Sequence, residues 1–559
     1  MDAEFGTFDY VIVGAGSAGC VLANRLSADP DTSVLLLEAG GEHRHFLIDM
    51  PLGMMRAMFK PQFTWRYMTQ PEPNLGGRRI MVPRGRMLGG SSSINGMFYM
   101  RGHSSDFDEW RQMGCTGWSY AEVLPYFKRM ERHWCDDTRW HGHDGPLDVV
   151  PVQTAGRLHE PLMQTAAAAG FAVSANLNGE TEEGFARGEL TIDRKGRRAS
   201  TARAYLDPVR RRPNLTVLTG ALTRRVVLDG KRAVGAEFNL QGARKIAGAR
   251  REVILCGGAY NSPQLLMLSG IGPAGHLQDH GIAVRHDLPG VGRNLSEHPR
   301  VPVHFGLQQP VSFLNELRAD KVALSVLRWR LAGTGAFASQ LNSCNIVIRT
   351  RPELERPDIQ LWSNPVRMDA QIWFPFYRKR QEDRITADVI LLHQQSRGWL
   401  ELASADPADF PRITLNIFDN AADMRTARDG IRLARRIYRT PPQADLTGAE
   451  ILPGEDRQSD AELDEYIRAR AEVTQHPVGT CAMGTGSMSV VDPHLRVCGL
   501  TGLRVVDASI MPTVPGGNTN APTIMVAEKA ADMILGRTPL PAEHVRSRTA
   551  DPALAGVSP

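Results

Sequence analysis

The stretch FDYVIVGAGSAG, residues 8–19, decides the fold. It begins with a short, mostly apolar run that ends at Gly14, which is typical of a buried strand. Small and apolar residues then recur at helical spacing over residues 17–27, and VLLLEAG at 34–40 predicts a second buried strand. Strand, turn, helix and strand in this order begin a doubly wound sheet, so the predicted class is α/β (α+β).

The turn between the first strand and the helix carries the pattern G-x-G-x-x-G. Its three glycines allow a tight turn, a close approach of the backbone to a pyrophosphate, and close packing of helix on strand. Glu38, at the end of the second strand, would accept hydrogen bonds from ribose hydroxyls and repel a 2′-phosphate, which disfavours NADP. We expect a Rossmann-like dinucleotide-binding domain and leave NAD and FAD open at this point. The predicted contacts are Gly14, Gly16, Ser17, Ala18, Gly19, Glu38 and Ala39.

Composition excludes several other classes. Lys+Arg 65 against Asp+Glu 61 gives a net charge of +4, too balanced over 559 residues for a dedicated nucleic-acid binder. Seven cysteines without a CxxC pair favour a reduced, intracellular protein. There is neither an apolar run long enough for a membrane span nor a basic N-terminal region of a signal peptide. We expect a cytoplasmic protein, with peripheral membrane association left open, that is a monomer or a homodimer.

Further sheet-forming segments occur in the middle and near the end of the chain. Residues 251–259 predict a strand that leads into a helix with Pro263 near its first turn, and 503–512 predict a strand before a helix at 522–535. We therefore expect a second, sheet-based domain inserted in pieces. The predicted division is 1–155, 210–305 and 480–540 for the dinucleotide domain, 156–209 and 306–479 for the substrate domain, and 541–559 for a loose tail.

Five segments together resemble one known family. They are PRGRMLGGSSSINGM (83–97), GGAYNSPQLLMLSGIG (257–272), PGVGRNLSEHP (289–299), QHPVGTCAMG (475–484) and LRVVDASIMPTVPGGNTNAPTIMVAEKAADMI (503–534). They resemble landmarks of the glucose–methanol–choline (GMC) oxidoreductases, and most of all the bacterial branch with choline dehydrogenase, alkanol dehydrogenase and hydroxymethylfurfural oxidase. The resemblance implies FAD and the oxidation of an alcohol, most simply a primary one, to an aldehyde or ketone with hydride transfer to flavin N5.

The resemblance also implies which residues bind FAD. Some members carry a histidine at the position of Ile94 and link it to the flavin; isoleucine cannot form that bond, so we expect non-covalent FAD. The further FAD contacts that the resemblance implies are Arg86, Leu88, Gly89, Ser91, Asn95, Gly96, Met97, Val226, Asp507, Ala508, Asn520 and Thr523.

The candidate base is His476. A capping box of Ser459 and Glu462 predicts a helix before it, and Pro477 pushes residue 476 toward extended backbone. His476 matches the family's catalytic histidine, and Asn518 matches its second active-site position, for which Asn520 is the competitor. A neutral imidazole can take a hydroxyl proton near neutral pH, and an amide can donate to the developing alkoxide.

Alternatives remain at the level of the sequence. They are a hydroxynitrile lyase of the same fold, an oxygen-using oxidase instead of a dehydrogenase, an NAD-dependent dehydrogenase, and a non-catalytic flavin-binding protein. The substrate is a small-molecule alcohol; the electron acceptor, whether oxygen, a quinone or an artificial dye, is unknown. We predict no metal site: HGHD at 141–144 is interpreted as a polar loop, His298 as a packing residue, and the arginines of 424–439 as a solvated helix face. The aromatic cluster WFPFY at 373–377 is left without a function.

Overall fold

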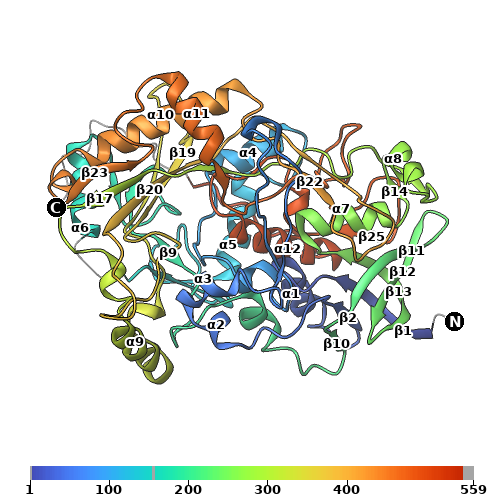
Figure 1. Ribbon diagram of the computed structural model, residues 1–559. Coiled ribbons are helices and arrows are strands. Elements are labelled where there is room, and N and C mark those ends of the chain that lie inside the picture. The colour runs from blue at the N-terminus through green and yellow to red at the C-terminus, as the bar shows by residue number, and fades with distance from the viewer. Residues whose placement is uncertain (1–2, 154–157, 546–559) are drawn as a thin grey trace.

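A computed structural model describes residues 3–153 and 158–545. Two large sheets organise these residues, as Figure 1 shows. The first sheet has the order β10-β2-β1-β13-β12-β11, with β25 beside β13. Its strands are β1 (Ala3–Val13), β2 (Val34–Leu37), β10 (Leu215–Leu218), β11 (Leu222–Asp229), β12 (Arg232–Leu240), β13 (Ala243–Leu255) and β25 (Leu503–Val505). Strands β10, β2, β1, β13 and β25 of this sheet run parallel to one another, which confirms the predicted α/β class.

The second sheet is mostly antiparallel and has the order β23-β17-β20-β19-β18-β8-β7, with β16 pairing β20 and β24. Its strands are β7 (Val173–Ser174), β8 (Gly184–Ala186), β16 (Pro299–Val301), β17 (His304–Leu307), β18 (Cys344–Ile348), β19 (Ile359–Asn364), β20 (Arg384–Leu391), β23 (Thr447–Leu452) and β24 (Glu472–Val473). Strands β16 and β17, which begin at Pro299 and His304, belong to the second sheet, whereas the predicted division assigns residues up to 305 to the dinucleotide domain. The division into two domains stays a prediction.

The helices cover these sheets. They are α1 (Ser17–Leu26), α2 (Phe46–Asp49), α3 (Met54–Ala57), α4 (Ser104–Gln112), α5 (Tyr120–Met130), α6 (His159–Ala168), α7 (Gly258–Leu268), α8 (Ala274–Asp279), α9 (Ala319–Ala332), α10 (Ala421–Tyr438), α11 (Asp460–Arg470) and α12 (Asn520–Ile534). Small sheets and hairpins are formed by β3 (Thr64–Trp65), β4 (Arg84–Gly85), β5 (Glu131–His133), β6 (Leu147–Pro151), β9 (Glu189–Leu190), β14 (Ile271–Gly272), β15 (His286–Asp287), β21 (Trp399–Glu401) and β22 (Arg412–Thr414).

Helix α1 and helix α12 lie side by side although some 500 residues separate them, as Figure 1 shows. The Ser17 hydroxyl donates to Asn520 Oδ1 at 2.8 Å, and further along Arg25 forms an ion pair with Glu528 at 2.7 Å. These two contacts join the first turns of both helices and, farther on, the last turn of α1 to the middle of α12. The N-termini of both helices therefore open at one place.

The strand–turn–helix prediction is confirmed and so is the capping box, in which Ser459 and Glu462 begin α11. One boundary was predicted wrongly. Helix α7 begins at Gly258, so Pro263 lies in its second turn and not in the first. A proline there leaves the Ala259 carbonyl without its helical donor, and the Thr480 hydroxyl donates to that carbonyl at 2.6 Å instead.

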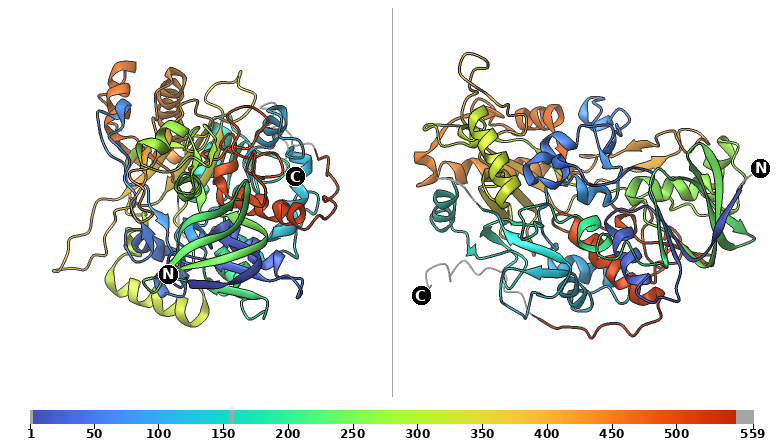
Figure 2. Two further views of the ribbon diagram at one scale, coloured as in Figure 1. Left: turned by 90° about the vertical axis from the view of Figure 1, so that its right-hand side faces the viewer. Right: turned by 90° about the horizontal axis from the view of Figure 1, so that it is seen from below.

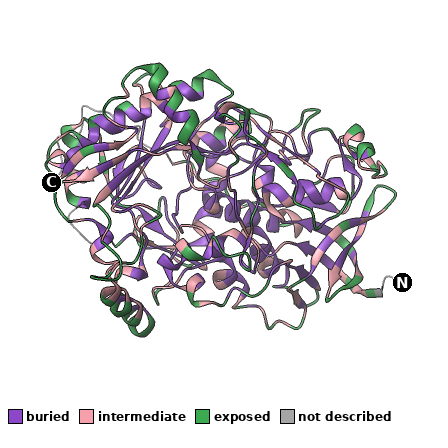
Figure 3. Ribbon diagram, viewed as in Figure 1, coloured by how far each residue is buried: buried purple, intermediate pink, exposed green. Residues whose placement is uncertain are grey.

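The structure also bears on the expected C-terminal tail, on the cysteines and on the expected absence of a membrane span. Glu543 contacts α5 through a backbone hydrogen bond to Ala121 and an ion pair with Lys128, so residue 543 is not part of a loose tail; residues 546–559 lie outside the described residues. All seven cysteines are free. In the described ranges no helix combines the length and the apolar character that crossing a bilayer requires. Most residues in the strands of the two large sheets are buried, whereas α9 is largely exposed (Figure 3).

Candidate active site

A cavity of about 800 Å³ is lined by residues of both sheets. Val13 and Leu37 line it at the carboxyl ends of β1 and β2, and Trp362 and Asp388 line it from β19 and β20. In open α/β sheets ligands bind outside the carboxyl ends of parallel strands. The predicted dinucleotide turn and the predicted base both line this one cavity.

The glycine turn fits a bound dinucleotide. A Cβ on Gly14 would lie 2.5 Å from the carbonyl oxygen of Cys256, and a Cβ on Gly19 would lie 1.9 Å from the carbonyl oxygen of Gly14. Gly14 also has the left-handed φ of 101°. Helix α1 then begins without a side-chain cap, so its first N–H groups are free for a phosphate. Gly14, Gly16, Ser17 and Ala18 line the cavity, whereas Gly19 only packs helix on strand.

Glu38 and Ala39 line the cavity next to this turn. The Glu38 carboxylate accepts hydrogen bonds from the backbone of Ala15 at 3.0 Å and of Gly40 at 2.8 Å. Burial raises the pKa of Glu38 to about 7. Each oxygen keeps a second lone pair, so the carboxylate has acceptor capacity left for ribose hydroxyls.

The second glycine segment forms another wall. A Cβ on Gly90 would lie 2.7 Å from Gly16 Cα, so the two glycine turns touch. Buried Arg198 donates to the Asn95 carbonyl at 2.6 Å and to Asn95 Oδ1 at 2.8 Å, which holds this segment. Ser91, Ile94, Asn95, Gly96 and Met97 line the cavity, whereas Leu88 and Gly89 lie behind it.

Two other predicted FAD contacts do not line the cavity. Val226 is buried in β11 and its N–H donates to Ser269 Oγ at 2.8 Å. The cavity is lined at the start of β11 by Ala221, Leu222 and Thr223, which precede Val226 in the chain. The guanidinium of Arg86 lies over the ring of Trp65 at 4.4 Å, outside the lining.

Asp507, Ala508, Asn520 and Thr523, for which the resemblance implies contacts with FAD, all line the cavity. The buried Asp507 carboxylate accepts from the Gly258 N–H at 2.8 Å and the Ser262 hydroxyl at 2.6 Å, which ties the segment after β25 to the start of α7. Helix α12 begins without a side-chain cap, so a second helix N-terminus opens on the cavity. Free N–H groups there suit a negatively charged cofactor edge.

His476 is held from several sides. Gln475 before it has the left-handed φ of 69°, and Arg84 donates to both its carbonyl and its side-chain oxygen, at 2.9 Å and 2.6 Å. A non-glycine residue in this region costs about 1–3 kcal/mol, so these bonds offset strain at the site. The N–H of His476 donates to Glu297 Oε1 at 2.6 Å, and burial raises the pKa of Glu297 to about 7.

The imidazole of His476 lies between two polar side chains. Its Nε2 lies 3.1 Å from Asn518 Nδ2, and its Nδ1 lies 3.1 Å from His298 Nδ1 and 2.9 Å from Thr474 Oγ1. Burial, followed by the neighbouring His298 and Arg84, lowers the pKa of His476 well below its ordinary value. The ring is therefore neutral near neutral pH, which is the form that a base needs.

The hydrogen-bond partners decide which nitrogen of His476 carries the proton. His298 Nε2 lies 3.1 Å from the Leu392 carbonyl, and a carbonyl can only accept, so His298 is protonated at Nε2. Burial lowers the pKa of His298 to about 3, so its Nδ1 is a bare acceptor. The contact between the two Nδ1 atoms then requires the proton on His476 Nδ1. The Nε2 atom of His476, which faces Asn518, is unprotonated.

Asn518 and Asn520 are distinguished by their partners. Asn518 Nδ2 contacts His476, and Asn518 Oδ1 is buried without a hydrogen-bond partner in the described residues. Asn520 Oδ1 already accepts from Ser17 in α1. The geometry therefore places Asn518 beside the imidazole, and Asn520 at the junction of the two helices.

Glu297, His298 and Arg84 were not predicted as site residues. His298 was interpreted as a packing residue; its ring is fully buried but it contacts His476, so that interpretation is too narrow. The only sequence signals were the positions of PRGRM and SEHP inside two family landmarks. Contacts across 178 residues of sequence cannot be derived from spacing.

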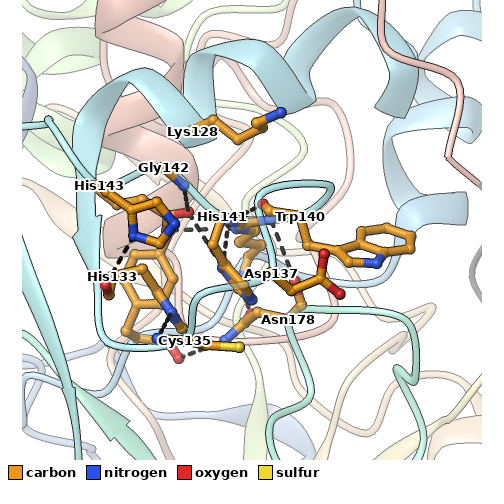
Figure 4. A network of polar contacts seen from close by, with 12 residues as sticks. Lys128, His133, Cys135, Asp137, Trp140, His141, Gly142, His143 and Asn178 are labelled. Carbon is orange, nitrogen blue, oxygen red and sulfur yellow. Dashed lines mark hydrogen bonds and ion pairs between the residues drawn. The ribbon is translucent and has the colours of Figure 1, made fainter.

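A polar cluster outside the cavity surrounds His141 (Figure 4). The ring of His141 stacks on His133 with centroids 3.6 Å apart, and ligand atoms of Glu131, His133 and His141 could converge on a metal. Arg101 however pairs with Glu131 and donates to His141 Nδ1 at 3.1 Å. Burial raises the pKa of Glu131, but Arg101 and the two histidines have the larger effect together and lower this pKa to about 2. A guanidinium already occupies these acceptors, which favours a structural network.

A cavity that contains both a dinucleotide turn and a neutral imidazole base is typical of an oxidoreductase that uses a nucleotide cofactor.

Comparisons with known proteins show which family of oxidoreductases this is. The GMC oxidoreductase family model matches residues 8–300 with its N-terminal part and 394–527 with its C-terminal part. The oxygen-dependent choline dehydrogenase of Pseudomonas fluorescens (strain SBW25) is 43% identical over 99% of this chain and 97% of its own length. That of Chromohalobacter salexigens is 44% identical over 96% of each chain.

Two solved structures are also similar to this chain over nearly its whole length. Pyridoxine 4-oxidase from Mesorbium loti aligns with a TM-score of 0.84 and 31% identity over 95% of this chain and 100% of its own. Formate oxidase of Aspergillus oryzae RIB40 aligns with a TM-score of 0.88 and 28% identity over 96% and 99%. The chain belongs to the GMC oxidoreductase family and is an FAD-dependent alcohol oxidoreductase. The predictions of family, fold class, cofactor and reaction type are confirmed.

The side chain of Ile94 predicts how the flavin is held. Ile94 is buried and lines the cavity, and its hydrocarbon side chain has no nucleophile for a covalent bond. Acid precipitation of the purified yellow protein should release all FAD into the supernatant and leave a colourless pellet. The measurement is the flavin absorbance of both fractions. Flavin fluorescence that stays with the chain on a denaturing gel would contradict non-covalent binding.

Proposed function

We propose that this chain oxidises an uncharged primary alcohol to the aldehyde, with His476 as the base. One observation carries the proposal: the unprotonated Nε2 of His476 and the amide of Asn518 lie 3.1 Å apart in the wall of the same cavity as the dinucleotide turn. An alcohol bound there can lose its hydroxyl proton to Nε2 in the same cavity whose residues would hold the cofactor.

The cofactor would be held by the two uncapped helix N-termini, the two touching glycine turns and the carboxylate of Glu38. Bound FAD supplies the chemistry that side chains lack, because it accepts the hydride of the substrate carbon. We propose that the residues contacting it are Gly14, Gly16, Ser17, Ala18, Glu38, Ala39, Ser91, Asn95, Gly96, Met97, Asp507, Ala508, Asn520 and Thr523.

His476 would take the hydroxyl proton at Nε2. An alcohol carbon is a poor hydride donor and its alkoxide is a good one, so removal of the proton prepares the transfer. The substrate oxygen binds between His476 Nε2 and Asn518 Nδ2 and replaces the direct contact between them. Asn518 then donates to the developing alkoxide without adding charge.

His298 acts through His476. Because its Nδ1 accepts the proton on His476 Nδ1, it keeps the basic nitrogen on the side of Asn518. Thr474 supports the same arrangement, since its hydroxyl contacts His476 Nδ1 at 2.9 Å. His298 is thus a positioning residue, comparable to the partner that orients the imidazole in other acid–base sites.

The charges of the cavity favour an uncharged substrate. The carboxylates of Asp388 and Glu472 line it, but both pair with Arg300, and His304 lies 3.2 Å from Asp388 as well. Arg300 follows His298 by two residues and its Nε is buried without a partner. A quaternary ammonium would need a free carboxylate or an aromatic cage. The aromatic rings of Trp65, Tyr67, Tyr260 and Phe410 do line the cavity, but the guanidinium of Arg86 already lies over the Trp65 ring. The names of the relatives favour choline, so choline is the second candidate.

Several expectations stay proposals. We propose a dehydrogenase and leave its electron acceptor open, because the curated relatives are named oxygen-dependent choline dehydrogenases and pyridoxine 4-oxidase and formate oxidase are named as oxidases. Cytoplasmic location, a monomer or homodimer, and the two-domain division are also proposed. None of the four relatives described above is named a lyase, so the lyase alternative gains no support from them.

Replacement of the base tests the mechanism. His476→Ala should retain FAD and lower the anaerobic flavin reduction rate by about 10²–10⁴-fold, the usual effect of losing a positioned acid–base group. In the wild-type enzyme the acid limb of this rate should lie below pH 6.5, because burial lowers the pKa of His476 and the unprotonated form persists into mildly acidic solution. Stopped-flow spectroscopy with saturating alcohol measures both.

Two asparagine variants provide the matched control. Asn518→Ala should lose about 10²–10³-fold in the same rate, as does removal of an oxyanion donor. Asn520→Ala, which removes a proposed FAD contact and leaves the contacts of His476 in place, should lose less of this rate than Asn518→Ala does. A His476→Ala rate within a few-fold of wild type, or a larger loss for Asn520→Ala than for Asn518→Ala, contradicts the assigned roles.

The substitutions His298→Asn and His298→Gln distinguish a role of His298 in setting the tautomer of His476 from a role in packing alone. An asparagine amide can take the place of Nδ1 and accept from His476, whereas a glutamine amide takes the place of Nε2 and contacts only Leu392. A lost hydrogen bond of about 1–1.5 kcal/mol predicts a roughly five- to tenfold lower reduction rate for His298→Gln. His298→Asn should remain within a few-fold of wild type. Equal losses with lowered thermal stability in both would mean a purely structural role.

Substrate charge is tested with two alcohols of the same shape. Choline and its uncharged isostere 3,3-dimethylbutan-1-ol differ in one atom. We expect the isostere to bind about tenfold tighter or more in anaerobic flavin reduction, because Asp388 and Glu472 are already paired with Arg300; tenfold corresponds to about 1.4 kcal/mol. Tighter binding of choline would make it the substrate and would leave the role of His476 untouched.

A further inference from the structure

Two exposed segments of the second sheet's unit form an apolar surface that the reaction does not use. One is the loop of residues 371–380, which contains the aromatic cluster, and the other is helix α9. Both project from the same side of the molecule, as the two views of Figure 2 show. We refer to them together as the loop–helix surface.

The loop ends in a tight, apolar tip. The backbone groups of Phe374 and Arg378 pair with each other, so Pro375, Phe376 and Tyr377 form the turn. Phe376 is fully exposed and Tyr377 is 84% exposed. Phe376 has the left-handed φ of 67°, which a bulky residue rarely adopts. The backbone thus carries strain while it presents an aromatic ring to the outside.

Helix α9 presents a second apolar stripe. Leu324, Leu327 and Leu331 recur at helical spacing and are exposed, whereas Trp329 packs inward and donates to the Gly196 carbonyl at 2.8 Å. The base of the loop is joined to this helix. Trp373 donates to the Leu317 carbonyl and its own carbonyl accepts from Ala319, at 3.1 Å and 2.9 Å. Loop and helix are therefore one connected surface.

Basic residues surround the apolar side chains. Residues 371–380 contain three basic residues and no acidic one, namely Arg378, Lys379 and Arg380. Helix α9 contains Lys321, Arg328 and Arg330 and one acidic residue, Asp320, which is paired with Arg318. Arg378, Lys379, Arg328 and Arg330 are exposed. Apolar side chains that protrude between exposed cations are the composition of an interfacial lipid-binding element.

We infer that the loop–helix surface docks on an anionic phospholipid membrane. The aromatic tip and the leucines would enter the boundary of headgroups and acyl chains, and the cations would contact lipid phosphates. A second copy of the chain fits less well, because a two-fold contact through this surface would bring its like charges together.

Docking would also orient the cavity. Arg367, Met368 and Asp369 precede the loop and line the cavity wall, and Met368 is partly exposed. The cavity therefore reaches the segment that leads into the docking tip. This inference does not depend on the choice between choline and an uncharged alcohol.

Vesicle flotation of the FAD-containing enzyme tests the inference. Wild type should bind vesicles of phosphatidylcholine with phosphatidylglycerol, bind pure phosphatidylcholine weakly, and detach as salt rises. Phe376→Ser/Tyr377→Ser should lower binding by about tenfold or more, since two large apolar side chains leave the interface. Arg378→Glu/Lys379→Glu should lose the preference for anionic vesicles.

Met488→Ser, which replaces an exposed apolar residue in a different segment, is the matched control and should bind as wild type does. All variants should reduce their flavin with a water-soluble alcohol at the wild-type rate, which shows that they are folded. Absence of wild-type binding, or unchanged binding of both loop variants, overturns the inference. A loop variant that changes the sedimenting mass without vesicles would instead identify an interface between two copies.

Discussion

The antiparallel pairing of β16 with β24 is the constraint on which the site depends. It sets Pro299 opposite Val473 and Arg300 opposite Glu472. The residues that precede β16 and follow β24 then lie together, so Glu297 accepts from the His476 backbone and His298 contacts its ring. Without this pairing the imidazole would have neither its orientation nor its neutral partner.

Burial and hydrogen bonding both leave the Nε2 atom of His476 free to accept a proton. Burial lowers its pKa and keeps it neutral, and the chain from the Leu392 carbonyl through His298 decides where its proton sits. A buried imidazole without such a partner could adopt either tautomer. Here the free nitrogen faces the amide that would bind the substrate oxygen.

The cofactor side of the cavity depends on close backbone approach. Gly14, Gly19 and Gly90 lie where a Cβ would meet backbone atoms closer than 3 Å, so these turns can touch only as glycines. Two helices that begin without side-chain caps leave free N–H groups beside them. The site thus offers dipoles in place of paired charges to a negatively charged ligand.

The sequence by itself determined the local parts: the strand–turn–helix at 8–26, the capping box before α11, and the short-range motifs that carry Glu38, His476 and Asn518. Local propensity and spacing are enough for the strand–turn–helix and the capping box, because each depends on residues a few positions apart. His476 and Asn518 were identified by the resemblance of the segments that contain them to a known family. The tertiary structure alone decided that Ala221 to Thr223 and not Val226 line the cavity, that His298 contacts the base, and that Arg300 neutralises the nearby carboxylates. Each of these depends on strand register or on contacts between distant segments, and no pattern within one segment specifies either of them.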